Sequence, residues 1–224
     1  MRRLTLVVAL AAGTMATAVL ADQAVMHPFQ SSTQIRGVRR VVLDIPAGEF
    51  HFRNGSANAL AIHGDVRRDY EGWTRREQNQ RIVDDITPEV VIKGDQAVIR
   101  RRFGNNATGW GARNKSMFEM TIEVPSGADI DVQTRFGEVH FDGAFGNVNV
   151  DMSAGEIHMI TPRANVRELA ASCRVGEVHT NTGEEIIERE GLFPRTTRFT
   201  NPNGGKGEVR LHVTAGEVHV KLTV

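Results

Sequence analysis

The sequence predicts an all-β protein: a single-domain β-solenoid (β-helix-like) of short stacked strands, with about nine residues in each strand-and-turn unit. Three observations predict this fold class. A short motif that begins with Gly-Glu recurs six times, units in the middle of the chain lie nine residues apart, and apolar residues alternate with polar ones inside the units. The many glycines and few aromatic residues also suit short strands joined by tight turns.

The recurring motif is Gly, then Glu, then a β-branched or aromatic residue, and His follows in five of the six copies. Internal repeats are the strongest guide to a fold, because every copy has to adopt the same supersecondary unit. Gly at the head of each unit suits a sharp turn between two faces, since it accepts a positive φ without a Cβ clash. The copies begin at Gly48, Gly137, Gly155, Gly176, Gly207 and Gly216.

The spacing of the central units predicts how they stack. Gly137, Gly146, Gly155 and Ala164 are nine residues apart, and each has an apolar residue two positions later. Apolar residues at a period of two indicate a strand with one buried face. Two units of a strand and a turn make one coil of eighteen residues, and successive coils would stack about 4.8 Å apart. One coil cannot bury its apolar face alone, so stacking has to close the core.

The N-terminal residues are typical of a secretory signal peptide, expected to span residues 1–21. The chain opens with Met1-Arg2-Arg3, and residues 4–20 carry no charge. Small residues precede a cleavage position after Ala21, with cleavage after Ala18 as the alternative. We therefore expect an exported protein, located in the periplasm or at the cell surface and extracellular.

The remaining chain is expected to form one domain. Residues 22–37 are predicted to be a flexible N-terminal segment and residues 38–224 the solenoid, since all-β domains often reach this length. Cys173 is the only cysteine, so no intramolecular disulfide can form; we expect a small core residue, with an intermolecular disulfide as the alternative. The 27 basic and 27 acidic residues balance, which argues against nucleic acid as a partner.

Strands are also predicted outside the regular units. Residues 90–93 and 97–100 flank Gly94-Asp95, which is the turn signal of a hairpin. Residues 118–124 alternate, which places Phe, Met, Ile and Val inward and Glu, Thr and Glu outward. The apolar alternation over residues 218–224 predicts a last strand that ends the stack.

Three segments break the pattern and are predicted to be loops on the stack: 67–81, 105–116 and 183–205, the last with a short helical turn as an alternative. Loops often hold binding residues. The basic run at residues 100–102 could contact anionic glycan or lipid headgroups, or be a solvated strand edge. The aromatic residues expected to mark interaction loops are Tyr70, Trp73 and Trp110.

The chain resembles a known family in its most regular part. Residues 124–132 (Val-Pro-Ser-Gly-Ala-Asp-Ile-Asp-Val), followed by the Gly-Glu-Val-x-Phe, Gly-Asn-Val-x-Val and Gly-Glu-Ile-x-Met units, resemble the bacterial putative-adhesin or "toast-rack" β-solenoid family. Residues 45–50 and 215–220 are similar to it too, so the resemblance covers most of residues 38–224. It implies a secreted or envelope β-solenoid of largely unknown function and brings no catalytic residue set.

The repeated His is a departure from that family's variable outer position. In Gly-Glu-Val-His the Val points inward, so Glu and His point outward on one face. His140 and His158 are predicted to be neighbours, with His179 one coil further and the glutamates in a parallel column. The column could hold Zn²⁺, Ni²⁺ or Cu²⁺, could be a solvated polar face, or could respond to pH. The candidate metal ligands are His140, His158, His179, Glu138, Glu156 and Glu177.

The sequence shows no nucleophile elbow, zinc-protease helix or phosphate loop, so it predicts a protein that is not an enzyme and has no cofactor apart from the candidate metal. The expected function is a non-enzymatic, adhesin-like interaction module that contacts an envelope or surface protein or a glycan through sheet faces and loops. Divalent-metal binding is the alternative, and a glycan-active β-helix enzyme is the second alternative. Self-association through open strand edges at the solenoid ends is also expected.

Overall fold

A computed structural model describes residues 23–70, 75–105, 107, 115–182, 186–189 and 195–224. The predicted signal peptide of residues 1–21 lies outside these ranges. The described protein is all-β: its strands join in one sheet of thirteen strands, accompanied by an α-helix and a short 3-10 helix. None of the described helical segments has the length and apolarity that a bilayer crossing requires.

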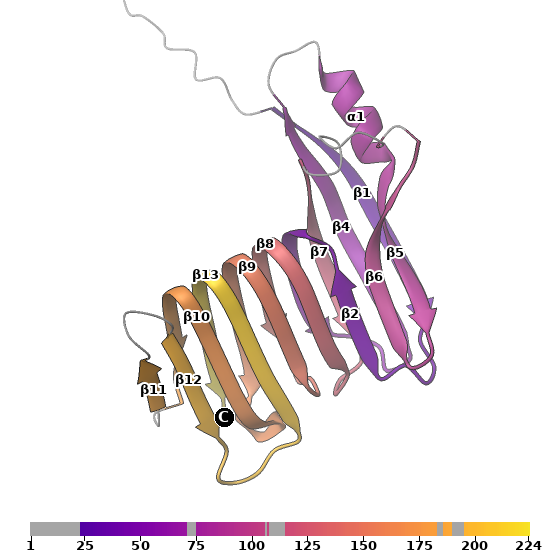
Figure 1. Cartoon of the computed structure of the whole chain (residues 1–224). Helices are drawn as coiled ribbons and strands as arrows, with labels where there is room; N and C mark the ends of the chain where they lie inside the picture. Colours follow the sequence, from indigo (N-terminus) through magenta and orange to yellow (C-terminus); the bar gives the residue numbers. More distant parts are fainter. Residues whose placement is uncertain (1–22, 71–74, 106, 108–114, 183–185, 190–194) are drawn as a thin grey trace, which may run out of the picture.

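The elements follow one another along the chain as shown in Figure 1. They are β1 (Gln23–Gln34), β2 (Arg40–Asp44), β3 (Ala47–Asn54), β4 (Ala59–Tyr70), α1 (Arg76–Asp84), β5 (Ile86–Lys93), β6 (Gln96–Phe103), β7 (Ser116–Val124), β8 (Asp129–Asp142), β9 (Val148–Pro162), η2 (Arg163–Asn165), β10 (Val166–Thr180), β11 (Ile186–Arg189), β12 (Arg195–Thr200) and β13 (Gly207–Thr223).

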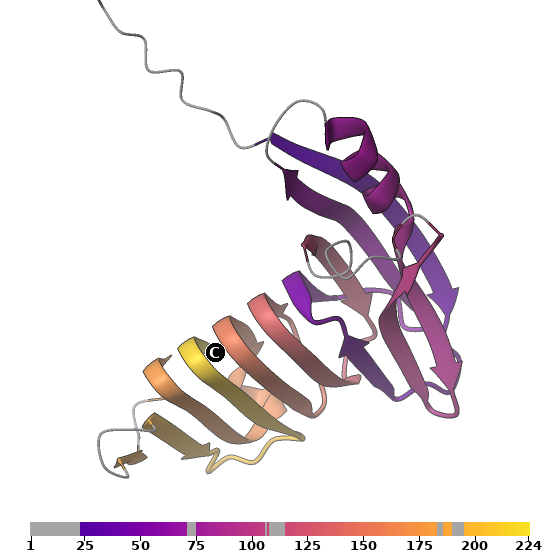
Figure 2. The ribbon, with the colours of Figure 1, turned by 45° about the horizontal axis from the view of Figure 1, so that its top comes forward.

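Parallel pairing organises the centre of the sheet. The strand order is β1-β4-β7-β3-β8-β9-β13-β10-β12-β11. Within it, the consecutive strands β7-β3-β8-β9-β13-β10 run parallel, and each is hydrogen-bonded to the next. Gly137 pairs with Gly155 and Ile130 with Val148, which is the eighteen-residue offset that the spacing predicts. We call the side-by-side arrangement of β3, β8, β9, β13 and β10 the stack, and it is clear in both views (Figures 1 and 2).

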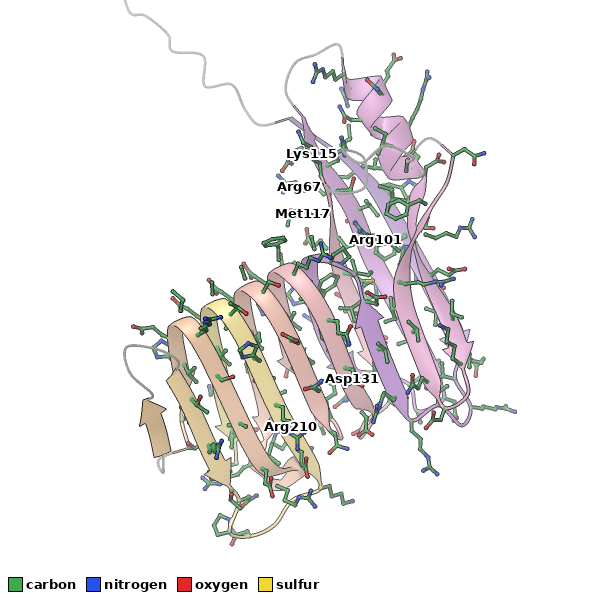
Figure 3. All side chains as sticks on the ribbon, viewed as in Figure 1. Arg67, Arg101, Lys115, Met117, Asp131 and Arg210 are labelled. Atoms are coloured by element: carbon green, nitrogen blue, oxygen red, sulfur yellow. The ribbon has the colours of Figure 1, made fainter. Side chains whose placement is uncertain are left out.

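Each long strand of the stack bends at its motif glycine and so contributes to two faces. In β8 the buried residues are Ile130, Val132 and Thr134 before the bend, but Val139 and Phe141 after it. Buried residues occupy even-numbered positions before the bend and odd-numbered positions after it. The change takes place at the bend, where two consecutive residues are exposed. We call the part of each strand before the glycine its first limb and the part after it the second limb. Asp131 and Arg210 mark the first-limb face in Figure 3.

The glycine at the bend is required because neighbouring strands approach closely there. Gly155 has φ +134°, and a Cβ on it would lie 1.8 Å from the carbonyl oxygen of Gly137. No side chain fits in that space. The glycines at the bends therefore stack on one another along the corner, which explains why Gly recurs at the head of these motif copies.

The prediction that the last strand ends the stack is wrong. β13 lies between β9 and β10, paired in parallel with both: Gly216 is in register with Gly155 on one side and with Gly176 on the other. The chain leaves β9, passes through η2 and builds β10 two strand positions away. The three extra residues between Gly155 and Gly176 belong to this longer step, and β13 fills the place that the step leaves.

The N-terminal expectations need two corrections. Residues 22–37 were expected to be flexible, but β1 pairs along its whole length with β4 and buries Val25. Segment 67–81 was expected to be a loop, but β4 runs on to Tyr70 and α1 begins at Arg76. The helix escaped detection because its apolar side is narrow: Val83 and Asn79 are its only buried residues, amid charged and amide side chains.

Segment 183–205 also differs from the loop prediction. It contains β11 and β12, which extend the sheet beyond β10 by antiparallel pairing. In contrast, the predicted hairpin is confirmed, since β5 and β6 pair through a turn at Gly94 and Asp95. The alternation predicted for residues 118–124 is confirmed too, because Phe118, Met120, Ile122 and Val124 of β7 are buried.

One apolar core runs through the stack. Val139 and Ile157 belong to it with Val218 next in line, and Val178 packs against it from β10. Cys173 is buried in the same core, as expected for a small interior residue. In the turned view, β1, β4, β5 and β6 stand at an angle to the stack (Figure 2).

Candidate functional site

Five imidazole rings form a column across the second limbs of the stack, and we call it the His column. Each ring lies nearly parallel to the next, at interplanar angles of 4 to 16°. The centroid distances are 4.4, 4.8, 4.9 and 4.8 Å, which is the spacing of adjacent strands. In spatial order the members are His51, His140, His158, His219 and His179.

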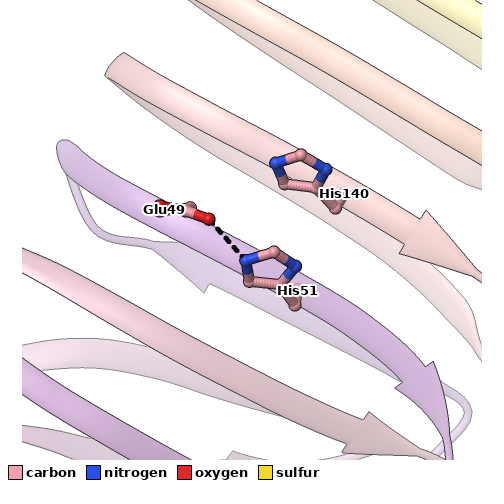
Figure 4. A group of neighbouring side chains, drawn as sticks. All are labelled: Glu49, His51 and His140. Atoms are coloured by element: carbon pink, nitrogen blue, oxygen red, sulfur yellow. Dashed lines mark hydrogen bonds and ion pairs between the residues drawn. The ribbon is translucent and has the colours of Figure 1, made fainter.

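A column of glutamates accompanies the His column, and we call it the Glu column. Each His Nε2 lies 2.7 to 3.1 Å from a carboxylate oxygen of the Glu two residues earlier in its own strand. Figure 4 shows one such pair, Glu49 with His51, and the ring of His140 stacked on the neighbouring strand. In the same spatial order the members are Glu49, Glu138, Glu156, Glu217 and Glu177.

The columns correct the predicted ladder in two ways. His140 and His158 are adjacent, as predicted. His179 is not next to His158, because His219 of β13 stands between them. His51 extends the column at the other end, since β3 pairs with β8. The signal for both additions was in the sequence, because both residues end a Gly-Glu-x-His motif, but the order of the strands was not.

Protonation of His140, in the interior of the column, is opposed by its surroundings. Burial lowers the pKa of His140, and the neighbouring rings of His51 and His158 lower it further by charge repulsion, while Glu138 acts in the opposite direction. The neutral form of His140 is therefore favoured in the folded state. The column as a whole combines five nitrogen ligands with five carboxylates on one face, which is a donor set for metal ions.

We expect the folded protein to lose stability as the pH falls below about 6.5, the usual pKa of His. The lowered pKa of His140 means that the unfolded chain takes up a proton in a pH range where the folded chain does not, and this favours unfolding. Above about pH 6.5 the imidazole is neutral in both the folded and the unfolded chain, so this destabilisation disappears. Urea unfolding at pH 7.5 and 5.5 should show a smaller pH effect in His140→Gln. His212→Gln, outside the column, is the control, and an unchanged pH effect in His140→Gln would contradict the expectation.

A second candidate site lies at the corner where β6 and β2 meet the stack, and we call it the corner groove. It has a volume of about 840 Å³ and is lined by residues of β6, β2, β8 and β9. Arg100, Arg101 and Arg135 line it together with Phe103 and Phe136. In Figure 3, Arg101 lies near the place where β6 meets the stack.

Four residues in register cross the floor of the corner groove. Arg100 pairs with Asp44, Asp44 with Gln133, and Gln133 with Asp151, each on the next strand. All of them line the groove, and they present a cation, two carboxylates and an amide. The sequence could not reveal this row, because its members come from four strands spread over more than a hundred residues.

Two side chains in the corner groove have unusual surroundings for their type. Phe136 is 57% exposed although it is a large apolar residue. The Thr134 hydroxyl is buried without a hydrogen-bond partner among the described residues. An exposed aromatic ring in a groove is a feature that a bound ligand would explain, whereas the Thr134 hydroxyl lies in the buried row of β8 and faces the core.

The predicted interaction loops lie largely outside the described residues. Trp73 and Trp110 fall in undescribed parts of the chain. Tyr70 is the last residue of β4, and only its backbone is described. These aromatic residues therefore stay predictions. Of the basic run at residues 100–102, Arg100 and Arg101 line the corner groove, and Arg100 forms an ion pair with Glu89.

No protein-family model and no curated protein sequence matches the chain. Solved structures do resemble it. A "putative cell adhesion protein" from Clostridium sporogenes matches 88% of this chain and 100% of its own, with a TM-score of 0.50 and 14% identity. A "putative adhesin" from Bacteroides fragilis covers 88% of this chain and 97% of its own, with a TM-score of 0.29 and 7% identity.

A "putative adhesin" from Parabacteroides merdae covers the same share of this chain and 96% of its own, with a TM-score of 0.27 and 8% identity. At 14% identity the likeness to the Clostridium sporogenes structure concerns the fold and not the ligand. The family resemblance predicted from the Gly-Glu units agrees with this structure. The chain therefore has, as its neighbours among solved structures, bacterial proteins named as adhesins whose function is unknown.

Proposed function

We propose that the protein is an exported, non-enzymatic, adhesin-like module of the bacterial envelope, wound as a β-solenoid, which binds an acidic glycan in the corner groove. The observation on which this depends is the combination in that groove of three arginines and an exposed aromatic ring. The names of the neighbouring structures are consistent with an adhesin-like role.

The arginines suit the acidic groups of a glycan. A guanidinium presents five N–H donors in a planar fork that matches a carboxylate or sulfate. Arg135 is exposed on the corner beside Phe136, and Arg101 lies over the ring of Phe103 at 5.0 Å from its centroid. Arg101 is thus held against an aromatic face, and the exposed ring of Phe136 offers a face on which a sugar ring could stack while its acidic group accepts hydrogen bonds.

The remaining lining residues suit sugar hydroxyls. Asp44, Asp151 and Gln133 offer acceptors in one row along the groove floor, at strand spacing. Each hydroxyl of a sugar can donate to one such acceptor. A mixture of charges of both signs also favours a polar ligand over a lipid tail.

An enzyme acting on glycans is the second candidate, because the groove does contain two carboxylates. Asp44 and Asp151 stand on either side of Gln133, so their backbones are about 10 Å apart. Glycosidases use two carboxyl groups at separations of this order. However, catalytic groups work in sites that exclude water, and both aspartates are exposed. The geometry therefore favours binding over hydrolysis.

The glycan proposal predicts a large loss of glycan affinity when the residues at the corner are replaced. We expect the Arg135→Gln/Phe136→Ala double variant to bind polygalacturonate at least about tenfold more weakly than the wild type, because a charge-assisted hydrogen bond contributes roughly 1.5–3 kcal/mol. Calorimetry or biolayer interferometry on residues 22–224 would measure this. Neutral dextran of the same length should bind poorly to both proteins.

A matched control exists three strand positions away. Arg174 and Val175 stand immediately before Gly176, as Arg135 and Phe136 stand before Gly137, but they do not line the groove. The Arg174→Gln/Val175→Ala variant should bind like the wild type. Equal loss in both variants, or no binding of polygalacturonate by the wild type, would overturn the proposal. Release of reducing sugars would instead support the enzyme, and Asp44→Asn would then abolish it.

A further inference from the structure

We propose that the His column and the Glu column together bind two divalent transition-metal ions, with Zn²⁺, Ni²⁺ and Cu²⁺ as the preferred class. One ion would be held at the β3–β8 end of the column and one at the β9–β13–β10 end. The inference is independent of the glycan proposal, since it concerns the second-limb face and shares no residue with the corner groove.

Three groups of side chains bring their ligand atoms together. In each group one nitrogen or oxygen atom per residue lies within 4.8 Å of the corresponding atoms of the other two. Each contains two imidazoles from adjacent strands and one carboxylate. The groups are Glu49, His51 and His140; Glu156, His158 and His219; and His179, Glu217 and His219.

The distances are close to those that a bound ion needs. Zn²⁺ binds nitrogen and carboxylate oxygen at about 2.0–2.2 Å, so two ligand atoms around a tetrahedral ion are about 3.4 Å apart. The His–Glu pairs of single strands, now at 2.7 to 2.9 Å, would have to open by about 0.5 to 0.7 Å. The cross-strand imidazole would have to approach by up to about 1.4 Å, and one ring of each pair would have to tilt out of the stack, because the lone pairs of two parallel rings do not meet at one ion.

The chemistry of the donors selects the class of metal. Imidazole nitrogen with carboxylate oxygen suits Zn²⁺, Ni²⁺ and Cu²⁺, whereas Mg²⁺ and Ca²⁺ prefer sites made of oxygen alone. Three protein ligands leave a fourth position for water or for a ligand from a partner. The parallel backbone below holds the donors at a fixed spacing, since each strand is hydrogen-bonded to its neighbours in unbroken register over the column.

The number of ions per chain follows from the fact that two of the three ligand groups share the ring of His219. His219 belongs to both groups at the β9–β13–β10 end, so one of its nitrogens can serve only one ion there. His51 and His140 form a separate group, which shares no residue with the other two. Two ions per chain are therefore expected, and His158 and His179 compete for the second ion as ligands beside His219.

Titration of residues 22–224 with Zn²⁺, followed by calorimetry at pH 7.5, tests the proposal. We expect two ions per wild-type chain, one ion for His51→Gln, one for His219→Gln, and none for the double variant. Binding should weaken at least tenfold at pH 5.5, where protons compete for the imidazoles. The visible absorption of wild-type protein loaded with Co²⁺ should show a four-coordinate nitrogen and oxygen site, a readout that needs no variant.

His212→Gln is the matched control, because His212 also projects from β13 but on the first-limb face, where it contacts Ser172. It should bind two ions like the wild type. Circular dichroism checks that each variant is folded. The proposal would be overturned if the wild-type protein bound no Zn²⁺ at Zn²⁺ concentrations up to about 100 µM. Unchanged binding in the double variant, or an equal loss in His212→Gln, would overturn it too, because either would place the ions elsewhere.

Discussion

Replacing Gly155 by Ala is expected to destabilise the protein by at least about 4 kcal/mol, enough to unfold many domains of this size. The new Cβ would stand 1.8 Å from the carbonyl oxygen of Gly137 and 2.9 Å from its carbonyl carbon, and backbone atoms cannot rotate away. The φ of +134° adds strain for any L-residue. Urea unfolding followed by circular dichroism would measure the loss.

Gly127→Ala separates the two causes. Gly127 also has a positive φ, +77°, but a Cβ there would meet nothing within 4 Å. The Gly127→Ala substitution should therefore lower the free energy of unfolding only by the strain of the backbone conformation, about 1–2 kcal/mol. If the two variants lost equal stability, the close approach of strands at the corner would not be the reason for the glycine column.

Replacing Val218 by Asp is expected to prevent folding or to cost more than about 4 kcal/mol. Val218 is fully buried between Ile157 of β9 and Val178 of β10, so the change would place an unpaired charge inside the core. The expectation depends on β13 lying inside the stack, because a valine on a strand at the end would have one side open to water. Thermal unfolding and solubility on expression would measure the effect.

Val175→Asp is the matched control on the adjacent strand. Val175 is 52% exposed at the corner, one residue before the glycine of β10. Its replacement should change the free energy of unfolding by less than about 1 kcal/mol, as is usual for surface sites. A stable, soluble Val218→Asp protein would contradict the position assigned to β13.

Local features of the fold were predictable because they depend on neighbouring residues. The alternation over residues 118–124 identifies the inner face of β7, and Gly94-Asp95 identifies the β5–β6 turn. The eighteen-residue offset of β8 and β9 follows from the spacing of Gly137, Gly146 and Gly155. In each case the signal lies within about twenty residues, so no knowledge of long-range pairing is needed.

Long-range pairing was not predictable, and the sites depend on it. Gly-Glu-Val-His at residues 216–219 has the same local pattern as its copies, and nothing in it states that it pairs between β9 and β10. The adjacency of His140 and His158 could be predicted because their strands are consecutive. The corner groove could not, because Arg100, Gln133 and Asp151 meet only through the pairing of separate strands.

The position of β13 has a consequence for how the molecule is built. Until residues 207–223 have been synthesised, β9 and β10 have no strand between them, and the unfilled position is on the order of 10 Å wide and bordered by two rows of unpaired backbone groups. The stack is complete only when this last strand pairs with both neighbours. Before that, the same position could accept the corresponding strand of another copy, which would give strand-exchanged dimers.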